Sequence, residues 1–279
     1  MASPRALPQT PAANAPAPAV AHKASGLTMA YTLPPDKLEK ARALYILDGK
    51  LIVISSVYSF IVLLALLSFG IVARYRNWAE KASSKRFVQA LIVVPLLLLT
   101  LDILHLPFRI YGHHIGLQYG FSVQGWGSWA LDVLKGEGLG LAIGTLVLYG
   151  LISIIRRSPK RWWFYFWLIA IPFGLFFVFI EPMVIDPIFY KYEPLEAHNP
   201  QLVQALEKVT QRGGLAIPRS RMYEMKASEK LTVLNAYVTG LGASKRVVIW
   251  DTTIQKTTTP ETLFIFGHEM GHYVLHHVA

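Results

Sequence analysis

Long apolar runs separated by short charged segments dominate the first two thirds of the chain. Each run is about as long as a helix needs to cross the hydrocarbon core of a bilayer. One such run is also compatible with a buried core helix, but four in succession are typical of a membrane protein. The predicted spans are residues 51–73, 87–106, 139–155 and 162–185.

The segments outside these runs differ in character. Residues 1–35 are rich in Pro and Ala and poor in large apolar residues, which predicts a disordered arm. Residues 36–186 form the predicted transmembrane domain. Within it, residues 107–138 are rich in glycine and aromatic residues and are predicted to be an interfacial loop with one amphipathic helix, Trp126–Leu134.

Residues 187–279 have the shorter and more polar patterns of a water-exposed domain. Asn199–Arg212 has apolar residues on one helical face. Arg221–Met225 and Lys245–Trp250 are predicted strands, and Leu234–Gly240 is a third that ends in a glycine turn. The mixture predicts a small α+β domain after the membrane part.

An HExxH motif, His268-Glu269-Met270-Gly271-His272, lies near the end of the chain. Residues four apart on a helix share one face, so His268 and His272 can offer two imidazole nitrogens to one Zn²⁺. Glu269 would then act as general base toward a water molecule at the metal. The alternative interpretation is a helix that carries these histidines by chance.

Composition narrows the class of protein. The chain is 53% hydrophobic and only 16% charged, which is too apolar for an ordinary soluble domain. It has no cysteine, so a metal would have to be held by histidine and carboxylate groups. A net charge of +10 is compatible with nucleic-acid binding, but the basic residues flank the apolar runs, so no nucleic-acid partner is expected.

Two basic segments lie between the predicted spans. Arg74–Arg86 contains five Lys and Arg residues, and Arg156–Arg161 contains four. The positive-inside rule would place both segments in the cytoplasm and the last domain on the other side. Basic residues before the first span, among them Lys37 and Lys50, weaken this inference, and the membrane orientation stays open.

Several stretches together resemble one family, the type 1 CAAX prenyl proteases, which are integral-membrane zinc metalloendopeptidases. The stretches that carry the resemblance are Leu106–Phe108, Ile185–Leu195, Asn235–Gly240, Ser244–Thr252 and His268–His272. The resemblance implies a membrane α-helical bundle, with about four spans in this chain, followed by a small α+β zincin-like (gluzincin) catalytic domain.

The resemblance also implies roles for particular residues. His268 and His272 would be zinc ligands, Glu269 the catalytic base, and Asn235, Ala236 and Tyr237 part of the strand that aligns the substrate. The residues alone leave Asn235 equally compatible with a turn or cap position. In the family the third zinc ligand is a glutamate on a later helix. The domain is therefore expected to be incomplete in this chain, truncated after the HExxH helix, and the chain inactive by itself.

The resulting hypothesis is a membrane-embedded zinc metalloendopeptidase that needs Zn²⁺ and lies in the lipid bilayer. Its substrate would be a peptide or protein, either prenylated or otherwise membrane-associated. The membrane would be the cytoplasmic membrane in a bacterium or the endoplasmic reticulum membrane in a eukaryote. The alternative is a catalytically inactive, truncated membrane protein that acts by interaction.

Overall fold

The computed structural model describes residues 34–240 and 244–275. The predicted disordered arm, residues 1–35, lies outside the described residues except for its last two. Residues from Ser55 onward form one compact unit.

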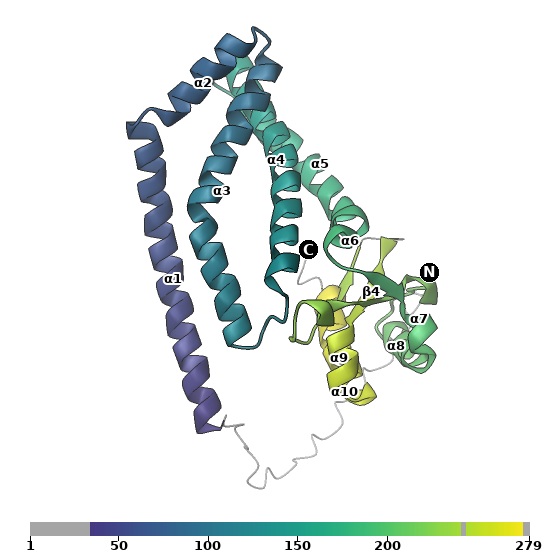
Figure 1. Cartoon of the computed structure of the whole chain (residues 1–279). Helices are drawn as coiled ribbons and strands as arrows, with labels where there is room; N and C mark the ends of the chain where they lie inside the picture. Colours follow the sequence, from purple (N-terminus) through teal and green to yellow (C-terminus); the bar gives the residue numbers. More distant parts are fainter. Residues whose placement is uncertain (1–33, 241–243, 276–279) are drawn as a thin grey trace, which may run out of the picture. The chain divides into compact units, whose positions relative to one another are not determined.

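Helices make up the described chain as far as residue 189 (Figure 1). They are α1 (Pro35–Ser68), α2 (Ile71–Ala82), α3 (Arg86–Gln118), α4 (Trp126–Arg157), α5 (Trp162–Ile180), the π-helical segment η1 (Glu181–Ile185) and α6 (Asp186–Phe189). Of these, α1, α3 and α4 are long and apolar enough to cross a membrane. A fourth span results if α5 and the segment after it, bent by 41°, are taken together. The predicted helical membrane part with about four spans is therefore confirmed.

The first and last predicted spans differ in extent from the helices. The first apolar run was expected to continue to residue 73, but α1 ends at Ser68, and Gly70 has a left-handed φ of 64°. A residue in this conformation ends a helix, and glycine adopts it without steric cost. The last run was expected to end at residue 185, but α5 gives way to η1 at Glu181, next to Pro182, which has no N–H for an α-helical bond.

The predicted interfacial loop at residues 107–138 is wrong before residue 119 and after residue 134, whereas the helix predicted at Trp126–Leu134 is the start of α4. α3 continues through Pro107 to Gln118, and α4 already begins at Trp126. Proline is tolerated inside long membrane helices because neighbouring groups satisfy the freed carbonyl. The polar residues in this stretch bond across the two helices, since Arg109 of α3 forms an ion pair with Glu137 of α4. Only the link at residues 119–125 is not helical.

A four-stranded sheet follows the helices. Its strands are β1 (Tyr192–Pro194), β2 (Met222–Met225), β3 (Ala236–Thr239) and β4 (Arg246–Trp250), in the spatial order β1-β2-β4-β3. β2 and β4 are parallel, and the other two pairs are antiparallel. The strands are connected by α7 (Leu195–His198), α8 (Pro200–Arg212), η2 (Arg219–Arg221) and η3 (Ala227–Glu229), and β4 is followed by α9 (Asp251–Lys256) and α10 (Thr259–Val274).

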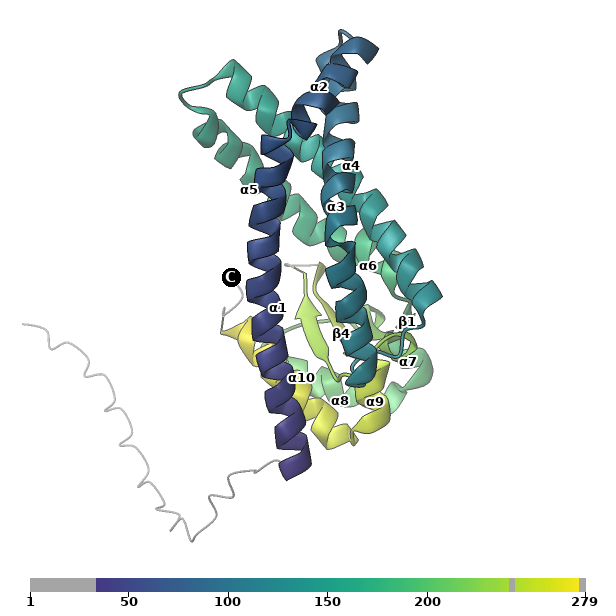
Figure 2. The ribbon, with the colours of Figure 1, turned by 60° about the vertical axis from the view of Figure 1, so that its left-hand side comes forward.

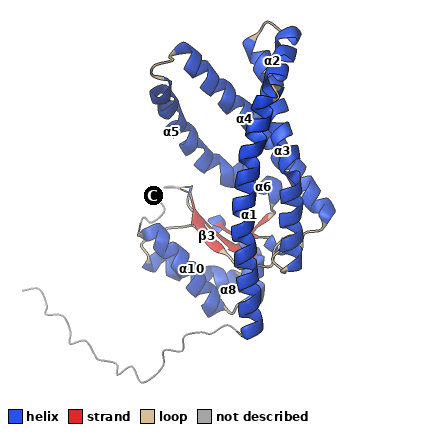
Figure 3. Cartoon of the chain, turned by 90° about the vertical axis from the view of Figure 1, so that its left-hand side faces the viewer, coloured by secondary structure: helices blue, strands red, loops and turns tan. Residues whose placement is uncertain are grey.

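α8 and α10 cover one face of this sheet (Figure 3). The core between them contains Leu206 of α8, Val247 and Ile249 of β4, and Phe266 of α10, all with no exposed surface. Alternate residues of a strand point to opposite faces, so Val248 and Tyr237 face the other way. There they pack with Tyr192, Tyr223 and Trp250, a group we call the tyrosine face.

The link between α3 and α4 is joined to the segment that leads into β3. Ser122 and Leu231 form an antiparallel bridge, and the Val123 N–H donates to the Lys230 carbonyl oxygen at 2.9 Å. The Lys230 ammonium forms an ion pair with Asp132 of α4 and also donates to the Phe189 carbonyl oxygen. The helical part and the sheet are thereby connected through backbone bonds and a partly buried ion pair.

The packing of α10 on the sheet predicts unequal effects for two nearby phenylalanines. Phe266 has no exposed surface, whereas Phe264, two residues earlier, is 79% exposed. Phe266→Ala should leave a cavity and destabilise the fold by roughly 3–5 kcal/mol. The matched variant Phe264→Ala should change stability by less than about 0.5 kcal/mol. Thermal unfolding and amide hydrogen exchange across α10 measure both, and equal effects would contradict this packing.

The tyrosine face predicts a loss of stability at alkaline pH. Burial raises the pKa of Tyr192 and of Tyr237, and the bond between their hydroxyl groups raises that of Tyr192 further. Because the folded-state values lie above the unfolded value of about 10, their contribution to stability is complete below that pH. It is lost as the pH rises from there through the folded-state pKa values. Tyr192→Phe/Tyr237→Phe should flatten this decline in alkaline unfolding curves, and an unchanged slope would contradict the assignment.

Candidate functional site

The helix that carries the HExxH motif has a well-defined start. Thr258 precedes α10, and the Glu261 carboxylate accepts bonds from the Thr258 N–H at 2.8 Å and from its hydroxyl at 2.7 Å. These donors lower the pKa of Glu261. A negative charge in the first turn also suits the positive end of the helix. Pro260 lies in the same turn, where its missing N–H costs no helical bond.

His268 and His272 lie together on one face of α10, as their spacing predicts. Their Nε2 atoms are 3.1 Å apart and their rings are perpendicular, at 87°. Two nitrogens bound to one tetrahedral zinc at about 2.05 Å would be about 3.3 Å apart. The pair therefore fits the donor positions of a zinc site. Among the described residues, no group of three or more His, Asp and Glu side chains is arranged to hold a metal.

Glu269 follows His268 on the same turn and is half-buried. The neighbouring Met270 packs into the core beside Phe266, which fixes the rotation of the helix about its axis. As a result, the two histidines lie on the face of α10 away from the core.

β3 lies at the edge of the sheet, and its start is fixed by Asn235. The Asn235 Oδ1 accepts from the Ala236 N–H at 2.8 Å, so this side chain caps the strand. The Asn235 backbone is also held, because its N–H donates to the Thr253 Oγ1 at 2.8 Å and its carbonyl accepts from the Trp250 N–H at 3.1 Å. The sequence left two roles open for Asn235, a turn or cap residue and a contact to substrate. In this structure its side chain caps the strand.

The register of β3 leaves part of its backbone directed outward. The bond from the Trp250 N–H to the Asn235 carbonyl makes these two residues a hydrogen-bonded pair. In an antiparallel ladder such pairs alternate with pairs whose backbone groups point away from the partner strand. Ala236 and Val238 therefore direct their backbone groups to the open edge. The Ala236 N–H is bonded to Asn235, which leaves the Val238 N–H and C=O for another chain.

The remaining predicted site residues lie in different surroundings. Ala236 has no exposed surface and packs in the same core as Phe266 and Met270. Tyr237 points to the tyrosine face, where its hydroxyl is 3.3 Å from that of Tyr192. The structure thus brings the HExxH helix and the backbone of β3 together, but it directs the Tyr237 side chain to the opposite face of the sheet from α10.

Sequence reasoning did not identify two residues that position this site. The Tyr273 hydroxyl donates to the Gly240 carbonyl oxygen at 2.9 Å, which links the residue after His272 to the end of β3. Thr252 donates to the Val233 carbonyl oxygen at 2.7 Å and holds the segment before β3 against α9. Nothing in the spacing of these residues points to their partners, which lie 33 and 19 positions away in the chain.

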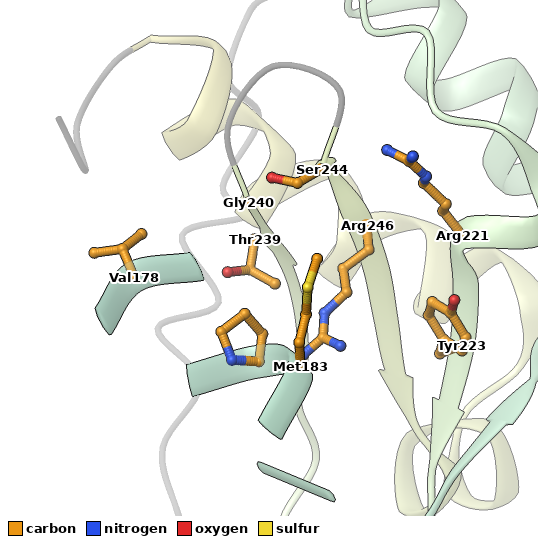
Figure 4. A pocket seen from close by; sticks show the side chains of 9 residues that line it. Val178, Met183, Arg221, Tyr223, Thr239, Gly240, Ser244 and Arg246 are labelled. Carbon is orange, nitrogen blue, oxygen red and sulfur yellow. The ribbon is translucent and has the colours of Figure 1, made fainter. Parts of the chain in front are cut away.

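A pocket of about 370 Å³ lies at the far end of β3, on the side of the tyrosine face (Figure 4). Thr239 and Gly240 line one wall, and the Arg246 side chain extends toward Met183. The Arg246 Nη2 donates to Asp186 at 3.2 Å, so its charge is partly neutralised. The other lining residues are Val178, Pro182, Arg221, Tyr223 and Ser244.

Two family profiles match the chain in succession. The profile described as "CAAX prenyl protease N-terminal, five membrane helices" matches residues 20–191. The profile described as "Peptidase family M48" matches residues 196–279. Together they cover nearly the whole chain, and they change over near β1.

Individual relatives agree with these profiles. The chain is 40% identical over 213 residues to "Uncharacterized metalloprotease YhfN" of Bacillus subtilis, covering 76% of this chain and 49% of the relative. It is 31% identical over 209 residues to "Probable CAAX prenyl protease 1" of Schizosaccharomyces pombe, covering 72% and 43%. The crystal structure of S. mikatae Ste24p superimposes with a TM-score of 0.76 at 25% identity, over 88% of this chain and 58% of that one.

The chain spans about half the length of the curated relatives that it matches. Over that length the order of a helical membrane part and a small M48 domain is preserved. The resemblance drawn from the motifs is confirmed by both profiles and by the fold. The chain belongs to the M48 peptidase family of CAAX-prenyl-protease-type membrane metalloproteases.

Proposed function

We propose that this chain carries the catalytic helix of a zinc-dependent endopeptidase that cleaves peptides at a membrane. The observation that supports this most directly is the pair of imidazoles on α10, with Nε2 atoms 3.1 Å apart. The helix that carries them packs against β3, which leaves an open strand edge. A metal-binding pair beside an edge strand is the arrangement that extended peptides require for metal-assisted hydrolysis.

Each residue then has a definite task. His268 and His272 hold the metal through Nε2, and they remain on one face because they are four positions apart. Zinc in this position supplies Lewis acidity toward the scissile carbonyl and makes water easier to deprotonate. Glu269 accepts the proton of the attacking water and returns it to the leaving amine. The third ligand of such a site would come from residues outside the described part of the chain.

The substrate is proposed to lie along β3 as one more strand. The Val238 N–H and C=O would bond to the backbone of the substrate. The Asn235 side chain would contact the substrate at the start of β3, once it no longer accepts the bond from the Ala236 N–H. Ala236 and Tyr237 contribute to this arrangement through their backbone. A substrate side chain near Thr239 that points toward the tyrosine face would enter the pocket beside Arg246.

The substrate class is proposed from the relatives. Several of them are named CAAX prenyl protease 1, which supports a peptide or protein substrate that is prenylated or otherwise held at the membrane. The match to a profile of five membrane helices supports a multi-pass membrane protein, which we propose lies in the cytoplasmic membrane of a bacterium or the endoplasmic reticulum membrane of a eukaryote.

Substitutions in the HExxH motif should separate metal binding from catalysis. Glu269→Gln should retain zinc and lower the rate of peptide cleavage by about 10²–10⁴-fold, because it removes the base and leaves the ligands. His268→Ala and His272→Ala should each lose zinc as well as activity, since each removes a ligand. Zinc content by mass spectrometry and cleavage of a fluorogenic peptide measure the two effects. Both are to be measured on this chain and on any longer natural protein that contains it.

These measurements also decide between the peptidase and the alternative of an interaction protein. If neither form binds zinc above background, the histidines are structural and the peptidase proposal is wrong. If zinc binds but Glu269→Gln cleaves as fast as the parent, the assigned base is wrong.

A proline at one position of β3 should impair substrate binding without unfolding the sheet. Val238→Pro removes an N–H that points to the open edge, and proline is tolerated on edge strands. The KM for peptide cleavage should rise at least tenfold while zinc content stays unchanged. The control Tyr237→Pro removes an N–H that pairs with β4 and should destabilise the domain instead. An unchanged KM in Val238→Pro would contradict strand addition at β3.

A further inference from the structure

The two basic segments of the chain, Arg74–Arg86 and Arg156–Arg161, have no part in the peptidase site. The structure brings residues from both of them to one place. A pocket of about 450 Å³ lies between α2, the first turns of α3 and the last turns of α4. Figure 2 shows α2 beside the start of α3.

Four arginines surround this pocket. Arg76 comes from α2, Arg86 from the first position of α3, and Arg156 and Arg157 from the end of α4. The one carboxylate among the lining residues is Glu80, which lies 3.7 Å from the Arg76 Nε. Within the described residues, the other three guanidinium groups form no ion pair with a carboxylate. Like charges that line one pocket repel one another, and an anion between them would relieve this repulsion.

The floor of the pocket has the opposite character. It consists mainly of apolar and aromatic side chains from the same three helices, with Gln89 and Ser153 as the polar members: Ala79, Ala90, Val93, Val94, Ile152 and Tyr149. Ala79 has no exposed surface and Val94 only 4%, whereas Ile152 is 42% exposed and Ala90 is partly exposed, so the floor is apolar but open to a ligand. The Tyr75 hydroxyl lies 2.7 Å from Thr100 Oγ1, which fixes α2 against α3. The pocket therefore combines four arginines with a largely apolar floor.

The start of α3 adds to the attraction for an anion. No side chain caps the first turn of this 33-residue helix in the described structure. Its free N–H groups form the positive end of the helix dipole at the same end of α3 as Arg86. A solvated basic flank of an ordinary span would need neither this convergence of three helices nor an apolar floor.

We propose that this pocket binds the headgroup of an anionic phospholipid, from the membrane leaflet in which α3 begins and α4 ends. The arginines would hold the phosphate through paired N–H bonds, which their planar groups favour. The apolar floor would receive the glycerol backbone and the first part of the acyl chains. Basic pockets between membrane helices recognise lipids by this combination of charge and apolar contact. The site is independent of the peptidase proposal, since it requires neither zinc nor Glu269.

The test compares lipid binding by the purified chain and by two variants with the same change of net charge. Arg86→Gln/Arg156→Gln/Arg157→Gln removes three charges from the pocket. The control Lys81→Gln/Lys160→Gln/Arg161→Gln removes three charges from the same segments outside it. Native mass spectrometry would count phosphatidylglycerol bound against phosphatidylcholine. Thermal unfolding in mixed micelles would measure the stabilisation by each lipid.

The pocket variant should bind phosphatidylglycerol at least about tenfold more weakly than the control and lose most of the lipid-dependent rise in melting temperature. Equal losses in both variants would mean that only the overall positive field attracts the lipid, and the site would be refuted. Tight binding of soluble glycerol 3-phosphate, as strong as that of the lipid, would refute the lipid as the ligand.

A variant that keeps every charge guards against loss of folding as the explanation. Ala90→Phe places a large side chain in the floor and leaves all four arginines in position. It should weaken phosphatidylglycerol binding while the helical content and the unfolding transition in neutral detergent stay those of the parent. Unchanged lipid binding in Ala90→Phe would show that the pocket is not where the lipid lies.

Discussion

The burial of β4 is the constraint on which the sheet and the site depend. Val247, Val248 and Ile249 have no exposed surface, so the backbone of this strand must find all its partners inside the protein. β2 pairs with one side and β3 with the other, which makes β3 an edge strand. The same burial requires cover on both faces. α8 and α10 cover one face and the tyrosines the other, so the helix that carries the two histidines packs next to β3.

A second set of contacts determines where β3 begins. The segment before it is held by α9 on one side, through Thr252 and Thr253, and by the link between α3 and α4 on the other. Lys230 joins these parts, because its ammonium contacts Asp132 of α4, the Phe189 carbonyl and the ring of Tyr190 at 4.7 Å. Both side chains of this ion pair are largely buried. Replacing only one of them would leave an uncompensated buried charge and destabilise the fold. The strand proposed to align the substrate is thus positioned by the membrane helices as well as by its own domain.

The sequence predicted what local patterns can specify. Apolar runs identified the spans, and the spacing of His268 and His272 placed both on one face of a helix. β-Branched residues and glycine turns identified β2, β3 and β4 within a residue or two, but the three-residue β1 was missed because it is too short to carry a pattern. The ends of the spans were less predictable, because Pro107 does not end α3 and the polar residues after it form pairs across helices. Tyr273 and Lys230 had no local signal at all. Their partners Gly240 and Asp132 lie 33 and 98 positions away, so only the folded chain brings them together.

The basic segments illustrate how one set of charges can have two physical consequences. Arginines at the ends of spans favour one side of a membrane whatever their arrangement in space. A count of Lys and Arg residues therefore predicts only the orientation of the spans. Their arrangement in space adds the second consequence, because Arg86 and Arg157 are 71 positions apart in the chain yet line one pocket. α4 connects the pocket to the sheet, because Asp132 near its start forms the ion pair with Lys230, and Arg156 and Arg157 lie at its end. A lipid phosphate held at one end would relieve the repulsion among the arginines and stabilise the helices that support β3 at the other.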